Sequence, residues 1–476
     1  MEITEAIGKK QQGLALARGK WAKFTESVKD DNKAATLGFL LENQQNWMES
    51  LDEDTKVQAI GSFDKYVFPL IQIVYPNLIS ADLVSVQPMQ GPTSLIFYRD
   101  TRFGSSKGAV NAGDSMFSSR TGWNDAAGFH YSDEVVAGEV WATADGTAGT
   151  GTLTWTLSLS YSPLRPGSVS FAYEDSSAAA ATITDDGAGG LISTKAGDLA
   201  GTNTVNYANG QVTVTFDTGR APTAGPIVAT YEYNSEGSTQ VPQVDIVLTS
   251  TPVQSRPRKL RARWSLESAA MLKAVHGKDA EVDILNDMAN ELKIEVDREI
   301  INDLLNLASA NNTSGVIPQE VFKKAPPTNV SLYMHRQSFV YSMTSLSNKI
   351  FKATRRHGAN WMVCGVNVAN IIQGQEGIAF TPSGNYSGSG AQFIGTLNGM
   401  WKIYIDPYLD ADTGIMGYQG DSMLDTGFVY APWIPFYSTP TYVLDDFIGR
   451  KGLLTHYGKK PVNGLFYGKL VLVAGP

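Results

Sequence analysis

The chain has 476 residues, of which 42% are hydrophobic and 18% charged, and its formal net charge is −9. This length allows two or three domains, and the balance of apolar and charged residues excludes a disordered chain. The acidic total disfavours tight nucleic-acid binding, which normally needs a basic excess. The start, MEITEAIGKKQQ, lacks the apolar core of a signal peptide, and no run of about 18 apolar residues predicts a membrane span.

Residues 1–66 are polar and helix-prone, and we expect them to form an N-terminal arm. Within them, KAATLGFLLENQQNWMESLD carries one apolar stripe with the spacing of a helix face. A lone helix of this length is marginal, so the stripe predicts either packing on its own domain or docking on a neighbouring subunit. The residues expected to make such an inter-subunit contact are Leu40 and Trp47.

Residues 67–100 read as a short helix followed by extended apolar segments, with SLIFYRD as a strand. Residues 101–149 are rich in glycine and serine, and their length favours an extended loop that reaches outward.

Residues 150–236 alternate apolar and polar side chains with the period of two that is typical of strands. Asp186-Gly187 and Asn209-Gly210 lie between such runs and indicate tight hairpins. We therefore expect a small β-sandwich-like domain inserted into the loop. Its aromatic residues would either fill the core or stack on sugars, and they are Trp155, Tyr161, Phe171, Tyr173, Tyr231 and Tyr233.

Residues 237–330 return with a strand and two helices. Gly277 is a natural end for the first helix, and Asp279 can cap a second one whose apolar stripe runs from Leu285 to Leu304. Before them lies the densest basic cluster, in which alternate members of a strand would share a face. It can serve an ionic contact with an acidic neighbour or a phosphate, or it can be a solvated edge that resists wrong pairing. Its members are Arg256, Arg258, Lys259, Arg261 and Arg263.

Residues 331–445 mix helix, strand and glycine-rich loops, and residues 446–476 end the chain with two strands. Cys364 is the single cysteine and lies in the apolar run WMVCGVNV, so we expect a buried thiol and no disulfide.

Residues suited to catalysis are scarce. None of the five histidines has a partner at metal-ligand spacing, and Gly104–Gly108 matches a GxSxG motif around Ser106 without the strand-to-helix turn that the motif needs. We therefore expect no catalytic, metal or cofactor site.

Two segments resemble the major capsid proteins of T4-like tailed bacteriophages. They are VYPNLISADLVSVQPMQGPTSLIFYRD and RKLRARWSLESAAMLKAVHGKDAEVDILNDMANELKIEVDREIINDLL, within residues 68–100 and 253–307. The resemblance implies an α+β fold of the HK97-like capsid type, here with an inserted all-β domain. Its parts would be an N-terminal arm (1–66), a P-domain with a spine helix (67–100, 237–330, 446–476), an E-loop (101–149), the insert (150–236) and an A-domain (331–445).

The same resemblance implies a structural subunit that self-assembles as hexamers and pentamers into an icosahedral head shell. It would be made in the host bacterial cytoplasm, end in the virion and enclose double-stranded DNA without sequence-specific binding. Implied partners are a portal, a scaffold, a maturation protease and decoration proteins, with no membrane. No lysine–asparagine crosslink is expected, because no carboxylate marks such a trio.

The resemblance also implies processing after Glu in a Leu/Ile-x-Glu context. Leu40-Leu41-Glu42 fits, which makes Glu42 a possible maturation cleavage site, but Ile3-Thr4-Glu5 and Leu51-Asp52-Glu53 fit equally. Two alternative functions stay open, namely a vertex paralogue of the same family that forms pentamers, and a carbohydrate-binding or glycoside-cleaving protein.

Overall fold

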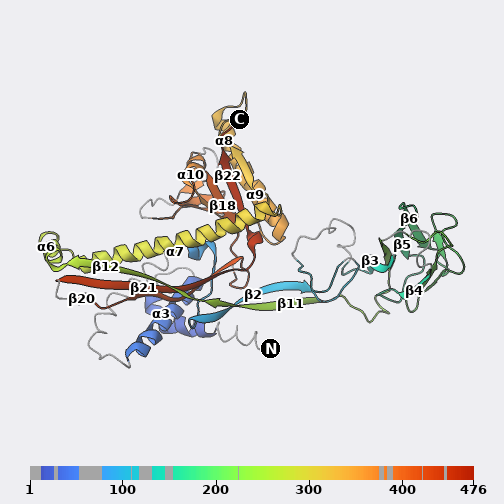
Figure 1. Cartoon of the computed structure of the whole chain (residues 1–476), viewed down its shortest axis with the longest axis horizontal. Helices are drawn as coiled ribbons and strands as arrows, with labels where there is room; N and C mark the ends of the chain where they lie inside the picture. Colours follow the sequence, from blue (N-terminus) through green and yellow to red (C-terminus); the bar gives the residue numbers. More distant parts are fainter. Residues whose placement is uncertain are drawn as a thin grey trace. The chain divides into compact units, whose positions relative to one another are not determined.

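The computed structural model divides into two compact units, residues 1–99 with 248–476 and residues 100–247. Helices and strands are mixed, which confirms the expected α+β class (Figure 1). The structure describes residues 12–25, 31–52, 78–108, 110–116, 131–144, 154–222, 225–374, 380–382, 390–420, 422–443 and 447–475.

A five-stranded sheet in the first unit joins segments that lie far apart in the sequence. β12 and β21 run antiparallel in unbroken register, from Arg256 opposite Tyr457 to Ser265 opposite Ile448. β12 has β21 as its only neighbour among the described strands, so its other edge is open within the part of the chain that the structure describes. The strand order is β1 (Ser85–Val86), β19 (Phe428–Ser438), β21 (Ile448–Pro461) and β12 (Arg256–Ser265), with β20 (Tyr442–Val443) also paired to β21.

The longest described helix, α7 (Ala280–Thr313), lies along the β12–β21 ladder (Figure 1). Its 34 residues make a rod about 50 Å long at 1.5 Å per residue. The Asp279 side chain caps it by accepting the Glu281 backbone N–H at 3.1 Å, as the sequence predicts. The shorter α6 (Leu266–His276) precedes it and ends at Gly277, which confirms the predicted stop.

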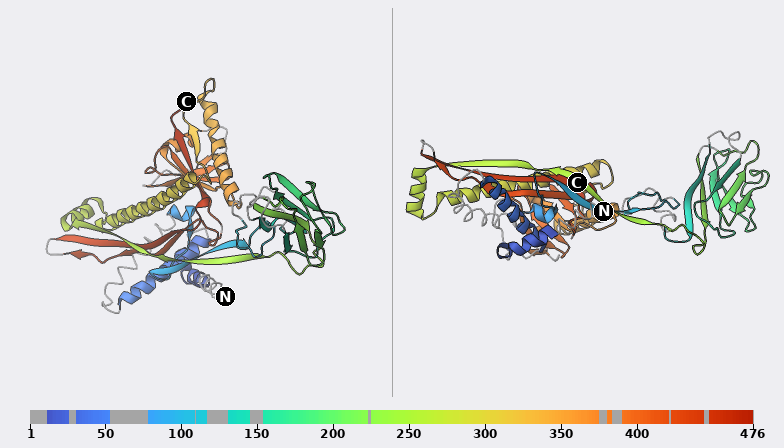
Figure 2. Two further views of the ribbon diagram at one scale, coloured as in Figure 1. Left: turned by 45° about the vertical axis from the view of Figure 1, so that its right-hand side comes forward. Right: turned by 90° about the horizontal axis from the view of Figure 1, so that it is seen from below.

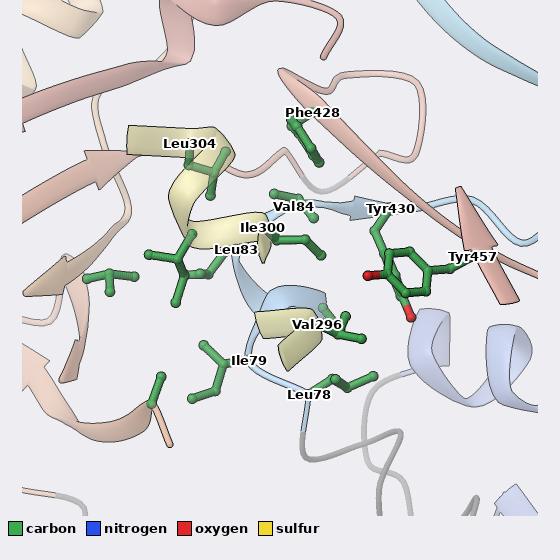
Figure 3. Packing of buried hydrophobic residues seen from close by; sticks show 14 of the residues in the cluster. Leu78, Ile79, Leu83, Val84, Val296, Ile300, Leu304, Phe428, Tyr430 and Tyr457 are labelled. Atoms are coloured by element: carbon green, nitrogen blue, oxygen red, sulfur yellow. The ribbon is translucent and has the colours of Figure 1, made fainter. Parts of the chain in front are cut away.

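The inner stripe of α7 anchors the main core of this unit. Val296, Ile300 and Leu304 meet the segment around α5 (Ser80–Leu83) and the aromatic rings of β19 and β21 (Figure 3). Ile300 and Leu304 are fully buried. A fully buried aliphatic side chain stabilises the fold by about 1.5–3 kcal/mol, so this stripe fixes where the rod lies.

The N-terminal helix α3 (Asp31–Asp52) packs on the same core. The short helix α2 (Ala22–Thr25) precedes it in the chain. Leu37, Leu40 and Leu41 are each 0% exposed. In this structure the stripe therefore packs on its own domain, which is the first of the two interpretations.

A seven-stranded sheet forms the rest of the first unit, with α8 (Leu332–Gln337), α9 (Phe339–Thr354) and α10 (Val366–Gln373). Cys364 in β14 is buried as expected, and burial raises the pKa of its thiol. The last strand, β22, belongs to this sheet, whereas β21 just before it belongs to the β12–β21 sheet. The order is β13 (Glu320–Lys323), β22 (Tyr467–Val473), β18 (Thr413–Gly417), β14 (Trp361–Cys364), β17 (Trp401–Ile405), β16 (Gln392–Leu397) and β15 (Phe380–Pro382); the 3-10 turn η4 (Gly464–Phe466) leads into β22.

The second unit is entered and left through paired strands, β2 (Thr93–Phe103) and β11 (Val244–Gln254) (Figure 2). It has its own aromatic core. Gly187 (φ +79°) and Gly210 (φ +71°) occupy the left-handed conformation at the two predicted turns. The strands form two sheets, with orders β3 (Val135–Ala144), β10 (Gly225–Glu232), β5 (Ser170–Glu174), β6 (Ala180–Asp185), β7 (Leu191–Ser193) and β4 (Thr154–Ser158), β9 (Gln211–Thr215), β8 (Thr204–Asn206).

One strand of this unit lies in the segment that we expected to be an extended loop. β3 pairs with β10 along its length, and its Trp141 and Val136 are buried in the core of the unit. Glycine and alanine interrupt the alternation in VVAGEVWATA, so the period-two pattern is weak there. The β structure therefore begins before residue 150.

Candidate assembly surface

The β12–β21 pair is unusually basic. Its sequences, RPRKLRARWS and IGRKGLLTHYGKKP, contain nine Lys and Arg and no Asp or Glu. Successive side chains of a strand point to opposite faces of the sheet, so these cations divide into two groups.

The first group lies on the face that α7 covers, and three of its members pair with acidic residues of α7. Ion pairs of this kind fix the rotation of the helix on the sheet in addition to the apolar stripe, because each joins one strand position to one helix position. The pairs are Arg258 with Glu295 (2.8 Å) and Glu299, Lys459 with Glu299 (2.6 Å) and Asp303 (2.5 Å), and Lys451 with Glu281 (2.5 Å).

Glu299 is the centre of this network. Its carboxylate accepts hydrogen bonds from Arg258 and from the Tyr457 hydroxyl and pairs with Lys459. Partial burial opposes ionisation, but these three contacts outweigh it and lower the pKa of Glu299 to about 2. The carboxylate is therefore ionised throughout the neutral range.

The second group points away from α7, and its three members on β12 are exposed. Lys259, Arg261 and Arg263 lie opposite Leu454, Gly452 and Arg450 of β21. Unlike Arg258, none of the three forms an ion pair within the described ranges. We call Lys259, Arg261 and Arg263 the cationic row.

The charge of the cationic row acts on its own face of the sheet. Burial, and then the nearby charge of Lys259, keep the pKa of His456 below its ordinary value. Because the row lies on the open edge strand, its charges also discourage a wrong strand from pairing there.

The structure thus separates the residues that the sequence grouped together. Arg258 is occupied inside the subunit, whereas the cationic row and the exposed Arg256 are available to a partner. Leu40 is buried within its own chain. The Trp47 side chain lies outside the described residues.

The possible cleavage residue, Glu42, lies inside α3. Its carboxylate pairs with Lys20 at 3.3 Å, and the neighbouring Leu41 is fully buried. A protease would reach this peptide bond only after this part of the helix opens.

The distribution of charge between the two units is a feature that the total net charge hides. Residues 100–247 contain 16 Asp and Glu against 6 Lys and Arg, a formal charge of −10. The remaining residues contain 31 acidic and 32 basic side chains, a formal charge of +1. Counting charges by segment would have shown this from the sequence alone.

A buried carboxylate on α7 was also not singled out from the sequence. Asp297 is 2% exposed and accepts the Ser80 backbone N–H at 3.0 Å, at the start of α5. Burial, partly offset by this hydrogen bond, raises the pKa of Asp297 to about 6. No sequence pattern marks it, since the partner lies 217 residues away.

The aromatic residues proposed as a sugar-stacking surface are mostly core residues. Tyr161, Phe171, Tyr173, Tyr231 and Tyr233 are all buried within the second unit. Trp155 is only partly buried and packs against the same core.

Within the described ranges, no group of three or more His, Cys, Asp or Glu residues could hold a metal ion. Among the same residues, no helix is both long and apolar enough to cross a membrane.

Comparison with known proteins gives consistent matches. A family model described as major capsid protein Gp23 matches residues 60–470. The major capsid protein of Vibrio phage KVP40 is 25% identical over 428 residues, which cover 84% of this chain and 76% of that protein. That of Enterobacteria phage T4 is 24% identical over 428 residues, covering 84% and 75%. The match to the solved capsid of Myoviridae phage XM1 covers 50% of this chain and 80% of the XM1 chain, with 11% identity. Its TM-score of 0.29 is too low to support an argument.

Proposed function

This chain belongs to the Gp23 family of major capsid proteins, and on that premise we propose how its surface holds one copy to the next. Membership gives the role itself, because the chain is a structural subunit of a T4-like phage head shell and its place is the virion. Such a subunit needs a stiff frame that carries contacts outward. We assign the frame to α7 clamped on β12 and β21.

The observation that carries the proposal is the cationic row. Lys259, Arg261 and Arg263 project from an open edge strand, on the face that α7 does not neutralise. Exposed like charges side by side repel one another, so an acidic partner lowers their free energy. The row is therefore a contact for an acidic surface.

Every neighbouring copy brings such a surface. Residues 100–247 carry a formal charge of −10 and fold around their own core. We assign this unit of one copy as the partner of the cationic row of another. Complementary charges of this kind set orientation and association rate more than affinity.

Each contact of this kind is weak, but a subunit in a shell makes many of them at once. An exposed ion pair contributes about 0.2–1 kcal/mol. A subunit that engages several neighbours at once gains because each further contact forms at a high effective concentration. Closure into a shell needs only that the repeated rotations close.

The finer parts of the role follow from the resemblance. They are assembly into hexamers and pentamers, the division into arm, P-domain, E-loop, insert and A-domain, and partnership with a portal, a scaffold, a maturation protease and decoration proteins. Processing after Glu42 would remove residues 1–42, which include the part of α3 from Asp31 to Glu42. N-terminal sequencing of mature particles tests it, and a shell that retains Met1 rules it out.

The central test is assembly of the full chain, followed by electron microscopy. We expect polyhedral or tubular particles from the wild type. The triple variant Lys259→Glu, Arg261→Glu, Arg263→Glu should assemble at least roughly tenfold less, because three favourable pairs of about 0.2–1 kcal/mol become repulsive.

A matched control changes the net charge equally at exposed lysines elsewhere. Lys323→Glu, Lys352→Glu and Lys402→Glu lie on other elements of the same unit. If this control loses assembly as strongly as the row variant, net charge and not the row is responsible. A wild-type chain that stays monomeric would contradict the shell role itself.

Copy number in the virion distinguishes a major capsid protein from a vertex paralogue of the same family. A major capsid protein dominates a stained gel of purified virions, whereas a subunit confined to the vertices is a minor band.

A further inference from the structure

Helix α6 is well formed but buries none of its side chains. The Ser265 hydroxyl accepts the Ser268 N–H at 3.2 Å, and Gly277 closes the other end with φ +64°. A capped helix of 11 residues is marginal alone and normally gains its stability by packing an apolar face.

The apolar face of α6 points outward. Met271 is 71% exposed and Val275 is 74% exposed. These residues are four apart and lie on one stripe. Only Ala269 and Leu272, on the other side, are partly covered.

A second exposed apolar side chain lies beside the start of α6. Phe447 is 72% exposed, and its carbonyl accepts the Leu266 N–H at 3.2 Å. Phe447 has φ +54°, in the left-handed region that is unfavourable for a bulky residue. Strain of this kind is typical of functional positions.

We propose that α6 and Phe447 form a contact with the same surface of a second copy of this chain, with the two α6 helices antiparallel. The argument for a second copy is charge complementarity. The outward stripe has Glu267 at its start, and the exposed Lys278 follows just beyond the C-cap. An antiparallel copy brings each Glu267 towards the Lys278 end of the other helix.

The geometry of such a pair is self-complementary. A two-fold contact places Met271 against Met271 and Glu267 close to Val275 of the other copy. Ala270 and Ala274 flank the stripe, and their small side chains allow close approach. The patch is much smaller than a stable interface of about 1,200–2,000 Å², so it adds to other contacts in an assembly.

Disulfide trapping in the full chain tests this register. We expect Met271→Cys to give a covalent dimer under oxidation, because the two sulfurs meet at the two-fold axis. Lys273→Cys, an exposed position on another side of α6, is the control and should give roughly tenfold less dimer, since its local concentration is low. The native Cys364 is buried, so the wild type supplies the background.

A double variant fixes the direction of the helices. Glu267→Cys with Val275→Cys should crosslink more than either single variant, because these positions face each other only in the antiparallel pair. Equal dimer yields from Met271→Cys and Lys273→Cys, or no Met271→Cys dimer in intact particles, would overturn the contact while leaving the shell role standing. Strong crosslinking of Glu267→Cys alone would overturn the antiparallel arrangement.

Discussion

At the scale of single residues, Glu299 joins three elements through one carboxylate. It binds Arg258 of β12 and Tyr457 and Lys459 of β21 while lying on α7. Removing one member of such a network leaves the others partly desolvated without a partner, which costs more than the pair itself contributes.

Replacing Glu299 with Gln should lower the free energy of unfolding at pH 7 by on the order of 1–2 kcal/mol, a value kept small because the network is partly exposed. The pKa of Glu299 is about 2 in the folded state against an ordinary 4.5. Its contribution is therefore present above about pH 4.5 and is lost as the pH falls towards 2. Denaturant melts from pH 7 to 2 measure this, with the exposed Glu291→Gln as control. If the free energy of unfolding falls as steeply between pH 4.5 and 2 in Glu299→Gln as in the wild type, the role assigned to Glu299 is wrong.

Asp297 should behave in the opposite sense, because its pKa is raised to about 6 from 3.8. The folded state binds the proton more tightly than the unfolded state, so stability is fully present below about pH 3.8 and declines as the pH rises to about 6. An amide at this position can still accept the Ser80 N–H. We expect Asp297→Asn to equal or exceed the wild type in stability at pH 7. The difference between the two should shrink as the pH falls from 6 to 4, and a constant difference would contradict the assignment.

At the scale of elements, the position of α7 is set by two interactions of different kinds, an apolar stripe and a row of ion pairs. The apolar stripe carries most of the energy. Ile300 lies at its middle and is fully buried between α5 and the strands of the sheet.

Truncating Ile300 to Ala should destabilise the first unit by about 2–5 kcal/mol, since the methyl groups are lost and a cavity remains. Asn302→Ala, on the exposed side of the same helix, should change stability by less than about 0.5 kcal/mol. Thermal unfolding followed by circular dichroism compares the two. Similar melting temperatures for both variants would mean that α7 is not the anchor of this core.

The elements that could be predicted from the sequence are those with local causes. Asp279 as a cap, Gly277 as a stop and the stripe of α7 are all confirmed, because each depends on neighbours within a few turns. The sheet membership of β22 and β3 depends on strands far away in the sequence, and no local pattern encodes it. For the same reason, the alternation of side chains along a strand predicts that Arg258 and Lys259 lie on opposite faces of the sheet, but not which of them is neutralised. Only the position of α7 shows that.

At the scale of the whole molecule, the excess of negative charge lies in one of the two units. The unit of residues 100–247 has a formal charge of −10, and the rest of the chain is close to neutral with an exposed cationic row. In the proposed pairing of the cationic row with the acidic unit of another copy, their attraction orients the two copies before any apolar surface meets.

Salt should therefore weaken assembly through the cationic row. The Debye length falls from about 10 Å at 0.1 M to about 3 Å at 1 M, which screens exposed pairs but leaves apolar burial intact. We expect the critical concentration for assembly, measured by light scattering, to rise roughly tenfold between 0.05 M and 0.5 M NaCl, as three exposed pairs of about 0.2–1 kcal/mol would give. The triple variant Lys259→Glu, Arg261→Glu, Arg263→Glu should show little of this dependence, and the Lys323→Glu, Lys352→Glu, Lys402→Glu control should keep it. A shell held mainly by apolar contacts would instead assemble more readily as the salt concentration rises. If the wild type behaves in this way, apolar surfaces hold the copies together. The cationic row would then only keep wrong strands from pairing with the edge of β12.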